Sequence, residues 1–151
     1  GQISFNLSHS HEMALIAVAY RQMIGVDLEY LREIPDTETI ARQFFSPEEV
    51  GVFRQLPESE KLTAFYRCWT RKEALIKAVG KGLSIPLDRF SVPLAPGDQT
   101  GLFHLEKSSG RNTRWSIYEI RPGPQYLAAL AVKGSGFLLS QWQWTEDFWR
   151  P

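Results

Sequence analysis

The chain has 151 residues, of which 43% are hydrophobic and 13% aromatic, so it can bury the core of one globular domain. Its 17 Lys and Arg residues balance 17 Asp and Glu residues, and this lack of excess charge argues against nucleic acid or a membrane surface as a partner. No apolar run approaches the ~18 residues of a membrane span, and the single cysteine, Cys68, excludes an intramolecular disulfide and favours a cytoplasmic location.

The first part of the chain carries the patterns of three consecutive strands, expected over residues 3–9, 12–20 and 23–30. The third contains IGVDLEY, where the alternation of an extended chain puts Asp27 and Glu29 on the same face. Like charges that close repel each other. The pair is therefore either a solvated strand face or part of a site for a hard divalent cation.

Three helices are expected next. Residues 36–45 and 47–56 are predicted to form two short helices, divided at Ser46-Pro47, which suits the N-cap and first turn of a new helix. Residues 59–82 have the apolar spacing of a long amphipathic helix that stops near Gly80.

The last part of the chain is predicted to be all strand, with Pro, Gly, Ser and Asn clusters at hairpin-like spacing. The expected strands are residues 88–92, 101–107, 113–120, 126–132 and 137–144. The order of strands, helices and strands, without βαβ alternation, predicts an α+β fold in which an antiparallel sheet packs against the long helix.

Glu73 and Lys77 lie one turn apart on the expected long helix and share a face with Trp69. They are either an ordinary intrahelical ion pair or part of a site with the strand carboxylates. In the second case Asp27, Glu29 and Glu73 would form an oxygen-rich set that favours Mg²⁺, or Mn²⁺, over zinc.

A polar cluster, FNLSHS, ends the first strand. Ser8 and His9 are adjacent and point to opposite faces of a strand, so a Ser/His nucleophile relay is not expected. Recognition of a phosphate group and a purely structural turn both remain open. Lys72, Lys77 and Lys81 would supply the cations that a phosphate needs.

These segments, in order, resemble the signature of the Sfp-type 4′-phosphopantetheinyl transferases. The matching segments are FNLSHS, IGVDLEY, FFSPEE, FYRCWTRKEALIKAVGKGL and PLDRFSV, which together run from Phe5 to Val92. The series with W-x-x-K-E-x-x-x-K inside it is far more specific than a single DxE. The resemblance implies magnesium-dependent transfer of phosphopantetheine from coenzyme A to a serine of an acyl or peptidyl carrier protein, with release of 3′,5′-ADP.

The resemblance also implies roles for single residues. Asp27, Glu29 and Glu73 match the metal ligands of the family. Ser8 and His9 match residues that hold the 3′-phosphate of coenzyme A.

Three further roles follow in the same way. Lys72 and Lys77 match the motif lysines, with Lys77 expected to neutralise phosphate charge. Glu49, the last residue of FSPEE, matches the glutamate of F-[ST]-x-x-E and is a candidate base for the carrier serine, although Glu48 stands beside it.

Sfp-type enzymes are built from two similar halves with the active site at their junction, and this sequence resembles the second half. Residues 1–151 are therefore expected to form a single domain, one half of a pseudo-dimeric fold. Either a first half or, as in the related short-chain synthases, a homo-oligomer would complete the site. A contrasting hypothesis is an incomplete fragment that binds a carrier protein or another partner without turnover.

Aromatic side chains crowd the C-terminal end of the chain. They are Phe137, Trp142, Trp144, Phe148 and Trp149. Some are expected to pack inside, and the others to form an apolar surface that a partner half or a second copy would cover.

Overall fold

The computed structural model of the protein describes residues 2–80, 85–103 and 113–144. Its strands are β1 (Ile3–Ser10), β2 (Met13–Tyr20), β3 (Ile24–Tyr30), β4 (Gln99–Leu102), β5 (Arg114–Ile120) and β6 (Tyr126–Lys133). Its helices are α1 (Thr37–Phe44), α2 (Pro47–Gln55) and α3 (Glu58–Val79), with a 3₁₀ helix at Leu87–Arg89. The α+β class and the long helix are confirmed.

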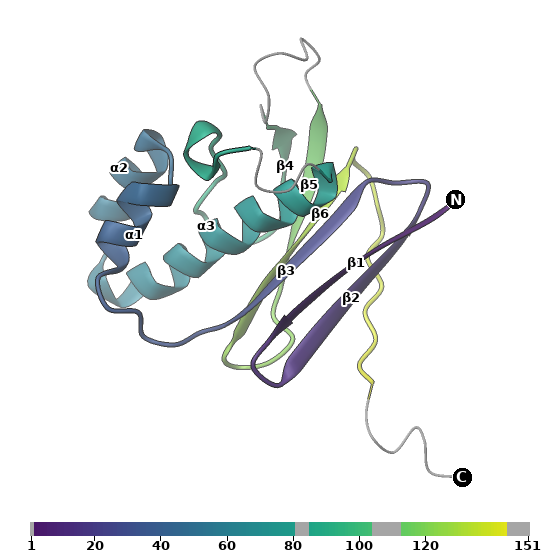
Figure 1. Ribbon diagram of the computed structural model, residues 1–151, viewed down its shortest axis with the longest axis horizontal. Helices are drawn as coiled ribbons and strands as arrows, with labels where there is room; N and C mark the ends of the chain where they lie inside the picture. Colours follow the sequence, from purple (N-terminus) through teal and green to yellow (C-terminus); the bar gives the residue numbers. More distant parts are fainter. Residues whose placement is uncertain (1, 81–84, 104–112, 145–151) are drawn as a thin grey trace.

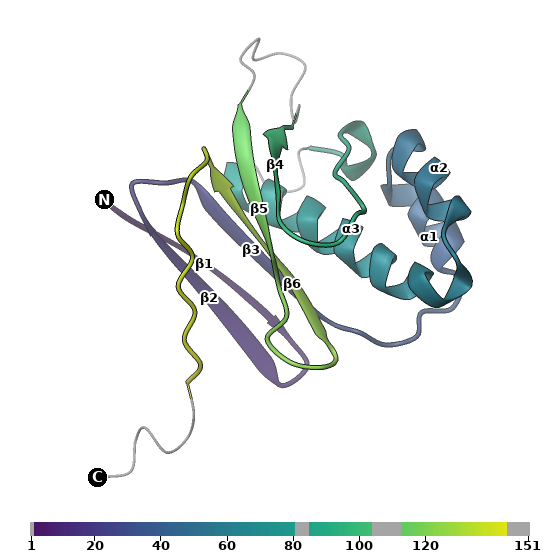
Figure 2. The same ribbon diagram turned by 180° about the vertical axis from the view of Figure 1, so that it is seen from behind.

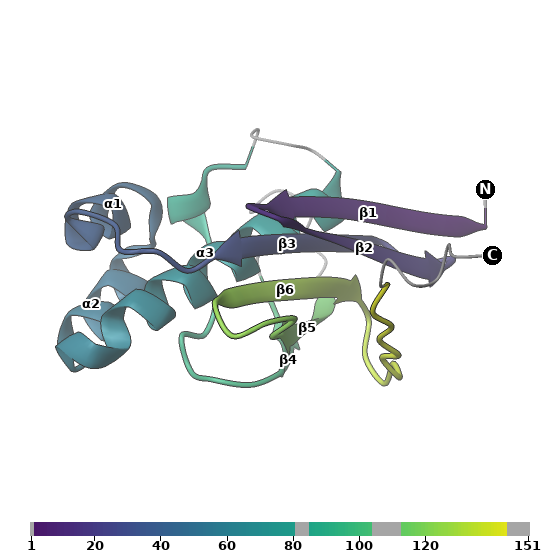
Figure 3. The ribbon, with the colours of Figure 1, turned by 90° about the horizontal axis from the view of Figure 1, so that it is seen from below.

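The elements form three layers. The middle layer is a four-stranded antiparallel sheet in the order β3-β6-β5-β4. Helix α3 lies across one face of this sheet, with α1 and α2 beside it (Figures 1 and 2). The β1–β2 hairpin lies on the other side, and β1 runs next to β3 (Figure 3).

Each face of the sheet has its own apolar core. The larger core joins the helices to residues such as Leu127 and Ala129 of β6. The smaller core contains Val26 and Leu28 of β3, covered by apolar residues of β2 such as Leu15. Strand alternation therefore turns Asp27 and Glu29 toward α3.

Gly25 sets how closely α3 approaches β3. A Cβ atom at this position would lie 2.1 Å from the carbonyl oxygen of Ala74 and 2.4 Å from the amide nitrogen of Ala78. Only glycine allows the two backbones to touch in this way. The contact brings the second half of α3 directly over the carboxylates of β3.

The three predicted helices are confirmed, and their observed ends lie within about three residues of the expected ones. Ser46 is the N-cap of α2 and forms a capping box with Glu49, and Pro47 is the first helical residue. Helix α3 ends at Gly80, whose φ of 72° is the left-handed conformation that glycine adopts at helix ends.

Two of the predicted strands are wrong. Residues 88–92 form part of the 3₁₀ helix and an irregular segment, because their backbone groups bond core side chains rather than a neighbouring strand. Lys72 donates to the carbonyls of Leu87 and Phe90, and the Val92 amide donates to Glu49. Residues 137–144 are also irregular. The strand expected over 101–107 begins earlier, at Gln99, and residues 104–107 lie outside the described part.

A buried ionic cluster ties α3 to β5. Glu119 accepts from Arg67 at 2.8 Å and from Arg71 at 3.1 Å, and all three side chains are at most 10% exposed. Arg71 also donates to the carbonyls of Ala95 and Gly97, which holds the segment before β4 against the helix.

Within the described part of the chain, no helix combines the length and apolar character that crossing a membrane would require.

Candidate active site

The structure brings the strand and helix charges together where α3 crosses β3. Lys77 Nζ lies 2.8 Å from Asp27 Oδ1 and 3.1 Å from the carbonyl oxygen of Val26. Glu29 is the next residue on the same face of β3, and Glu73 lies one turn before Lys77 on α3. Lys77 therefore pairs with Asp27 across the two elements.

The three carboxylates repel one another and are partly withdrawn from water. Burial raises the pKa of Asp27, against the opposing charge of Lys77. Burial, and then the negative charge of Asp27, raise the pKa of Glu29 to about 7, and the same two causes raise the pKa of Glu73. Burial therefore disfavours the charged form of all three carboxylates, and a further positive charge beside them would favour it.

One oxygen of this cluster lacks a partner. Asp27 Oδ2 is buried and accepts no hydrogen bond from the residues that the structure describes. Such an atom costs free energy unless a ligand satisfies it. Within residues 2–80, 85–103 and 113–144, no three acidic, His or Cys side chains already surround a common point as metal ligands. The carboxylates are therefore neighbours that fit a hard cation in type and charge, without forming a closed metal cage.

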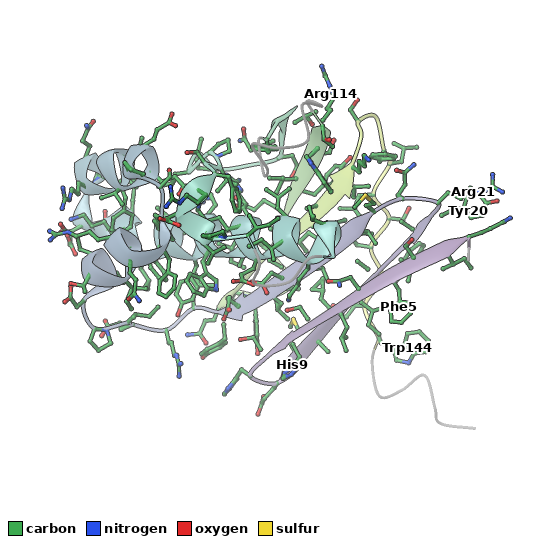
Figure 4. All side chains as sticks on the ribbon, turned by 45° about the horizontal axis from the view of Figure 1, so that its top comes forward. Phe5, His9, Tyr20, Arg21, Arg114 and Trp144 are labelled. Carbon is green, nitrogen blue, oxygen red and sulfur yellow. The ribbon has the colours of Figure 1, made fainter. Side chains whose placement is uncertain are left out.

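Ser8 lies in the same site, whereas His9 is on the opposite, exposed face of β1. The Ser8 hydroxyl accepts from the Leu28 amide at 3.0 Å and lies 3.4 Å from Lys77 Nζ. His9 is exposed at the turn end of the hairpin (Figure 4). His11 stacks on Tyr30 with ring centroids 4.5 Å apart.

Glu49 and Lys72 are not part of this cluster. They form an ion pair of 2.8 Å in the core, with side chains 1% and 0% exposed. Glu49 also accepts from the amides of Ser46 and Val92, and Lys72 donates to Leu87 and Phe90. Neither side chain has surface for a ligand, so these positions do not support Glu49 as base or Lys72 as a coenzyme A contact.

Lys81 and the C-terminal aromatic residues were also singled out by the sequence. Lys81, Phe148 and Trp149 lie outside the described residues. Of the remaining C-terminal rings, Phe137 packs against the smaller core, whereas Trp142 is 87% exposed.

The sequence did not predict the buried charges of Arg67, Arg71 and Glu119. The spacing of the two arginines, one helical turn apart, was the available signal.

Comparison with known proteins decides the family. The model of the 4′-phosphopantetheinyl transferase superfamily matches residues 23–131. The chain belongs to this superfamily. The match includes β3 and α3, and with them all three carboxylates and Lys77.

Individual proteins are similar to this chain over most of its length. The 4′-phosphopantetheinyl transferase HetI of Nostoc sp. is 40% identical over 145 residues, which are 96% of this chain and 55% of that protein. The 4′-phosphopantetheinyl transferase Sfp of Bacillus subtilis is 38% identical over 120 residues, 79% of this chain and 51% of that protein. The Thermotoga maritima holo-[acyl-carrier-protein] synthase aligns over 74% of this chain and 63% of that chain, with a TM-score of 0.48 and 17% identity. The chain spans about half the length of the curated relatives it matches.

Proposed function

We propose that this chain contributes the metal and nucleotide site of a 4′-phosphopantetheinyl transferase. The reaction moves phosphopantetheine from coenzyme A to a serine hydroxyl of an acyl or peptidyl carrier protein, releasing 3′,5′-ADP and the serine proton. The observation that carries the proposal is the cluster of Asp27, Glu29, Glu73 and Lys77 inside the region that matches the family. A cytoplasmic location remains a prediction.

Asp27, Glu29 and Glu73 would hold Mg²⁺, or Mn²⁺, in this proposal. Two observations support this assignment: Asp27 Oδ2 has no hydrogen-bond partner among the described residues, and burial, followed by the charge of Asp27, raises the pKa of Glu29 to about 7. When bound, the cation would neutralise phosphate charge and help orient the donor. Lys77 would add a positive charge beside it, held in place by Asp27 and the Val26 carbonyl.

The transfer itself tests the proposal. The chain, alone and with a homologous first half supplied, is incubated with coenzyme A, Mg²⁺ and a carrier protein, and the carrier is weighed by mass spectrometry. Addition of phosphopantetheine supports the proposal. The half-length match favours one alternative, a binding module without turnover. Carrier binding without transfer in either condition would establish that alternative.

Ser8 and His9 would contact the 3′-phosphate of coenzyme A. We expect His9→Ala to raise the KM for coenzyme A about tenfold, because a charge-assisted hydrogen bond contributes roughly 1.5–3 kcal/mol. The KM for 3′-dephospho-coenzyme A should barely change, since that donor lacks the phosphate. Steady-state kinetics with both donors measures the difference, and equal effects would remove the assignment.

Glu49 and Lys72 would have a structural role within the core. The pair joins α2, α3 and the segment around Val92 through one ion pair and four hydrogen bonds to backbone groups. We propose that this arrangement fixes the helices beneath the site and that neither residue contacts coenzyme A or the carrier serine.

An exposed apolar surface lies on the outer side of the hairpin. Its six side chains are between 52% and 73% exposed and form three cross-strand pairs. They are Ile3 with Tyr20, Phe5 with Val18, and Leu7 with Ile16. Figure 4 shows Phe5 and Tyr20 pointing away from the body of the molecule. This hairpin surface, more than the C-terminal rings, fits the expectation of a face covered by a second copy or a first half.

The isolated chain is expected to self-associate through the hairpin surface. Burying apolar area contributes roughly 25 cal/mol per Å², so Phe5→Ser with Val18→Ser should shift sedimentation at micromolar concentration toward monomer. Leu138→Ser is the matched control, because Leu138 is 99% exposed but lies outside the hairpin. A wild-type chain that sediments as a monomer and binds no hydrophobic dye would contradict the prediction.

A further inference from the structure

Strand β1 is attached to β3 by side chains instead of a backbone ladder. The Val26 amide donates to Asn6 Oδ1 at 2.9 Å, and the Leu28 amide donates to Ser8 Oγ at 3.0 Å. The Tyr30 amide donates to Ser10 Oγ at 3.0 Å. Acceptors and donors both advance by two residues, so the strands run parallel in a fixed register. Figure 1 shows the parallel course of β1 and β3. We call Asn6, Ser8 and Ser10 the acceptor row.

The acceptor row supplies hydrogen-bond acceptors to the edge of the sheet at β3. Strand β3 pairs with β6 on one side only, so the amides of Val26, Leu28 and Tyr30 need other partners. A backbone ladder from β1 would satisfy the carbonyls of this edge as well as its amides. The acceptor row supplies acceptors to the amides, so it leaves the carbonyls available to other donors.

Among the carbonyls of the β3 edge, that of Val26 accepts a hydrogen bond from Lys77. Lys77 Nζ donates to it at 3.1 Å and lies 3.4 Å from Ser8 Oγ and 2.8 Å from Asp27 Oδ1. The ammonium group thus contacts both strands at the middle of the acceptor row. A direct backbone pairing of β1 with β3 would compete for this carbonyl and would remove the Ser8 hydroxyl from between the strands.

We propose that Asn6 and Ser10 are positioning residues for the Lys77–Asp27 pair. No hydrogen bond among the described residues joins them to Lys77 or Asp27. They hold β1 in register on each side of Ser8, and Ser8 in turn faces Lys77. The link to transfer rests on the proposed function, whereas the positioning of Lys77 does not.

Substitutions in the acceptor row test the proposal in the ligand-free chain. Ser10→Ala and Asn6→Leu each remove one acceptor, and Ser10→Thr restores the hydroxyl. Ser4→Ala is the matched control, because Ser4 lies on the same face of β1 and has no side-chain hydrogen bond in the described structure. NMR measures two rates of hydrogen exchange with water. One is the rate at the Leu28 backbone amide, and the other is the rate at the Lys77 ammonium group.

We expect Ser10→Ala and Asn6→Leu each to speed both exchange rates by about tenfold, the scale of one lost hydrogen bond. Ser10→Thr and Ser4→Ala should match the wild type. The proposal is overturned if Ser10→Ala speeds exchange only at the Tyr30 amide and Asn6→Leu only at the Val26 amide. In that case the exchange rate of the Lys77 ammonium group would equal that of the wild type.

A transfer assay adds the functional readout. Ser10→Ala should lower activity about tenfold and Ser10→Thr should restore it. A wild-type chain that never transfers, even with a first half supplied, would contradict the proposed function, while the exchange rates would still decide the positioning role.

Discussion

Asp27→Ala is expected to lower the rate of phosphopantetheine transfer by roughly 10²-fold or more, the effect of losing one electrostatic stabiliser of a transition state. The substitution removes the buried Oδ2, which has no partner among the described residues, and the Oδ1 that holds Lys77 at 2.8 Å. Both proposed sources of positive charge, the cation and the lysine, lose their anchor. Carrier modification by mass spectrometry measures the loss, and titration with Mn²⁺ followed by EPR measures the cation.

Two comparisons make this result specific. Glu33→Ala removes an exposed carboxylate just beyond β3 and should leave both transfer and Mn²⁺ binding near wild type. Chelation of the divalent cation should reduce wild-type activity at least as much as Asp27→Ala does. Wild-type transfer that persists in excess chelator would refute the metal assignment.

Lys72→Met is expected to lower the free energy of unfolding by about 3–5 kcal/mol, because it leaves a buried carboxylate without its counter-charge. The Glu49 side chain is 1% exposed, so water cannot replace the ammonium group. The carbonyls of Leu87 and Phe90 lose their donor as well. Urea denaturation followed by circular dichroism measures the change.

The double variant Lys72→Met with Glu49→Gln should recover part of this loss, since no unpaired charge remains in the core. Lys61→Met is the control on the same helix. Its partner Glu58 is 88% exposed and Lys61 itself is half-buried at 22%, so water screens this pair and the expected change is within about 1 kcal/mol. If Lys72 instead binds coenzyme A, Lys72→Met would raise the KM for coenzyme A and leave stability near wild type.

Local sequence signals predicted the parts of the site that depend on strand and helix periods. Alternation in IGVDLEY placed Asp27 and Glu29 on one face, and helical spacing placed Glu73 beside Lys77. The cap at Ser46 and the stop at Gly80 follow from single residue types with strong conformational preferences.

Long-range pairings could not be predicted in the same way. The spacing of Glu49 and Lys72 gives no sign that they meet in the core, because their contact depends on how α2 packs against α3. Residues 88–92 have the composition of a strand, and only the buried donor and acceptor of that pair explain why they form none. The polar alternation at Asn6, Ser8 and Ser10 was visible, but its partners on β3 were not.

The backbone contact at Gly25 affects how this site tolerates mutation elsewhere. Where two elements are separated by side chains, any change of core volume shifts them relative to each other. Here Gly25 of β3, two residues before Asp27, lies directly against the backbone of Ala74 and Ala78 in α3. Neutral substitutions can accumulate in the surrounding core while the span between Asp27 and Lys77 stays nearly constant. Position 25 is the exception, because any side chain there would push the helix and its two charged residues away from the strand.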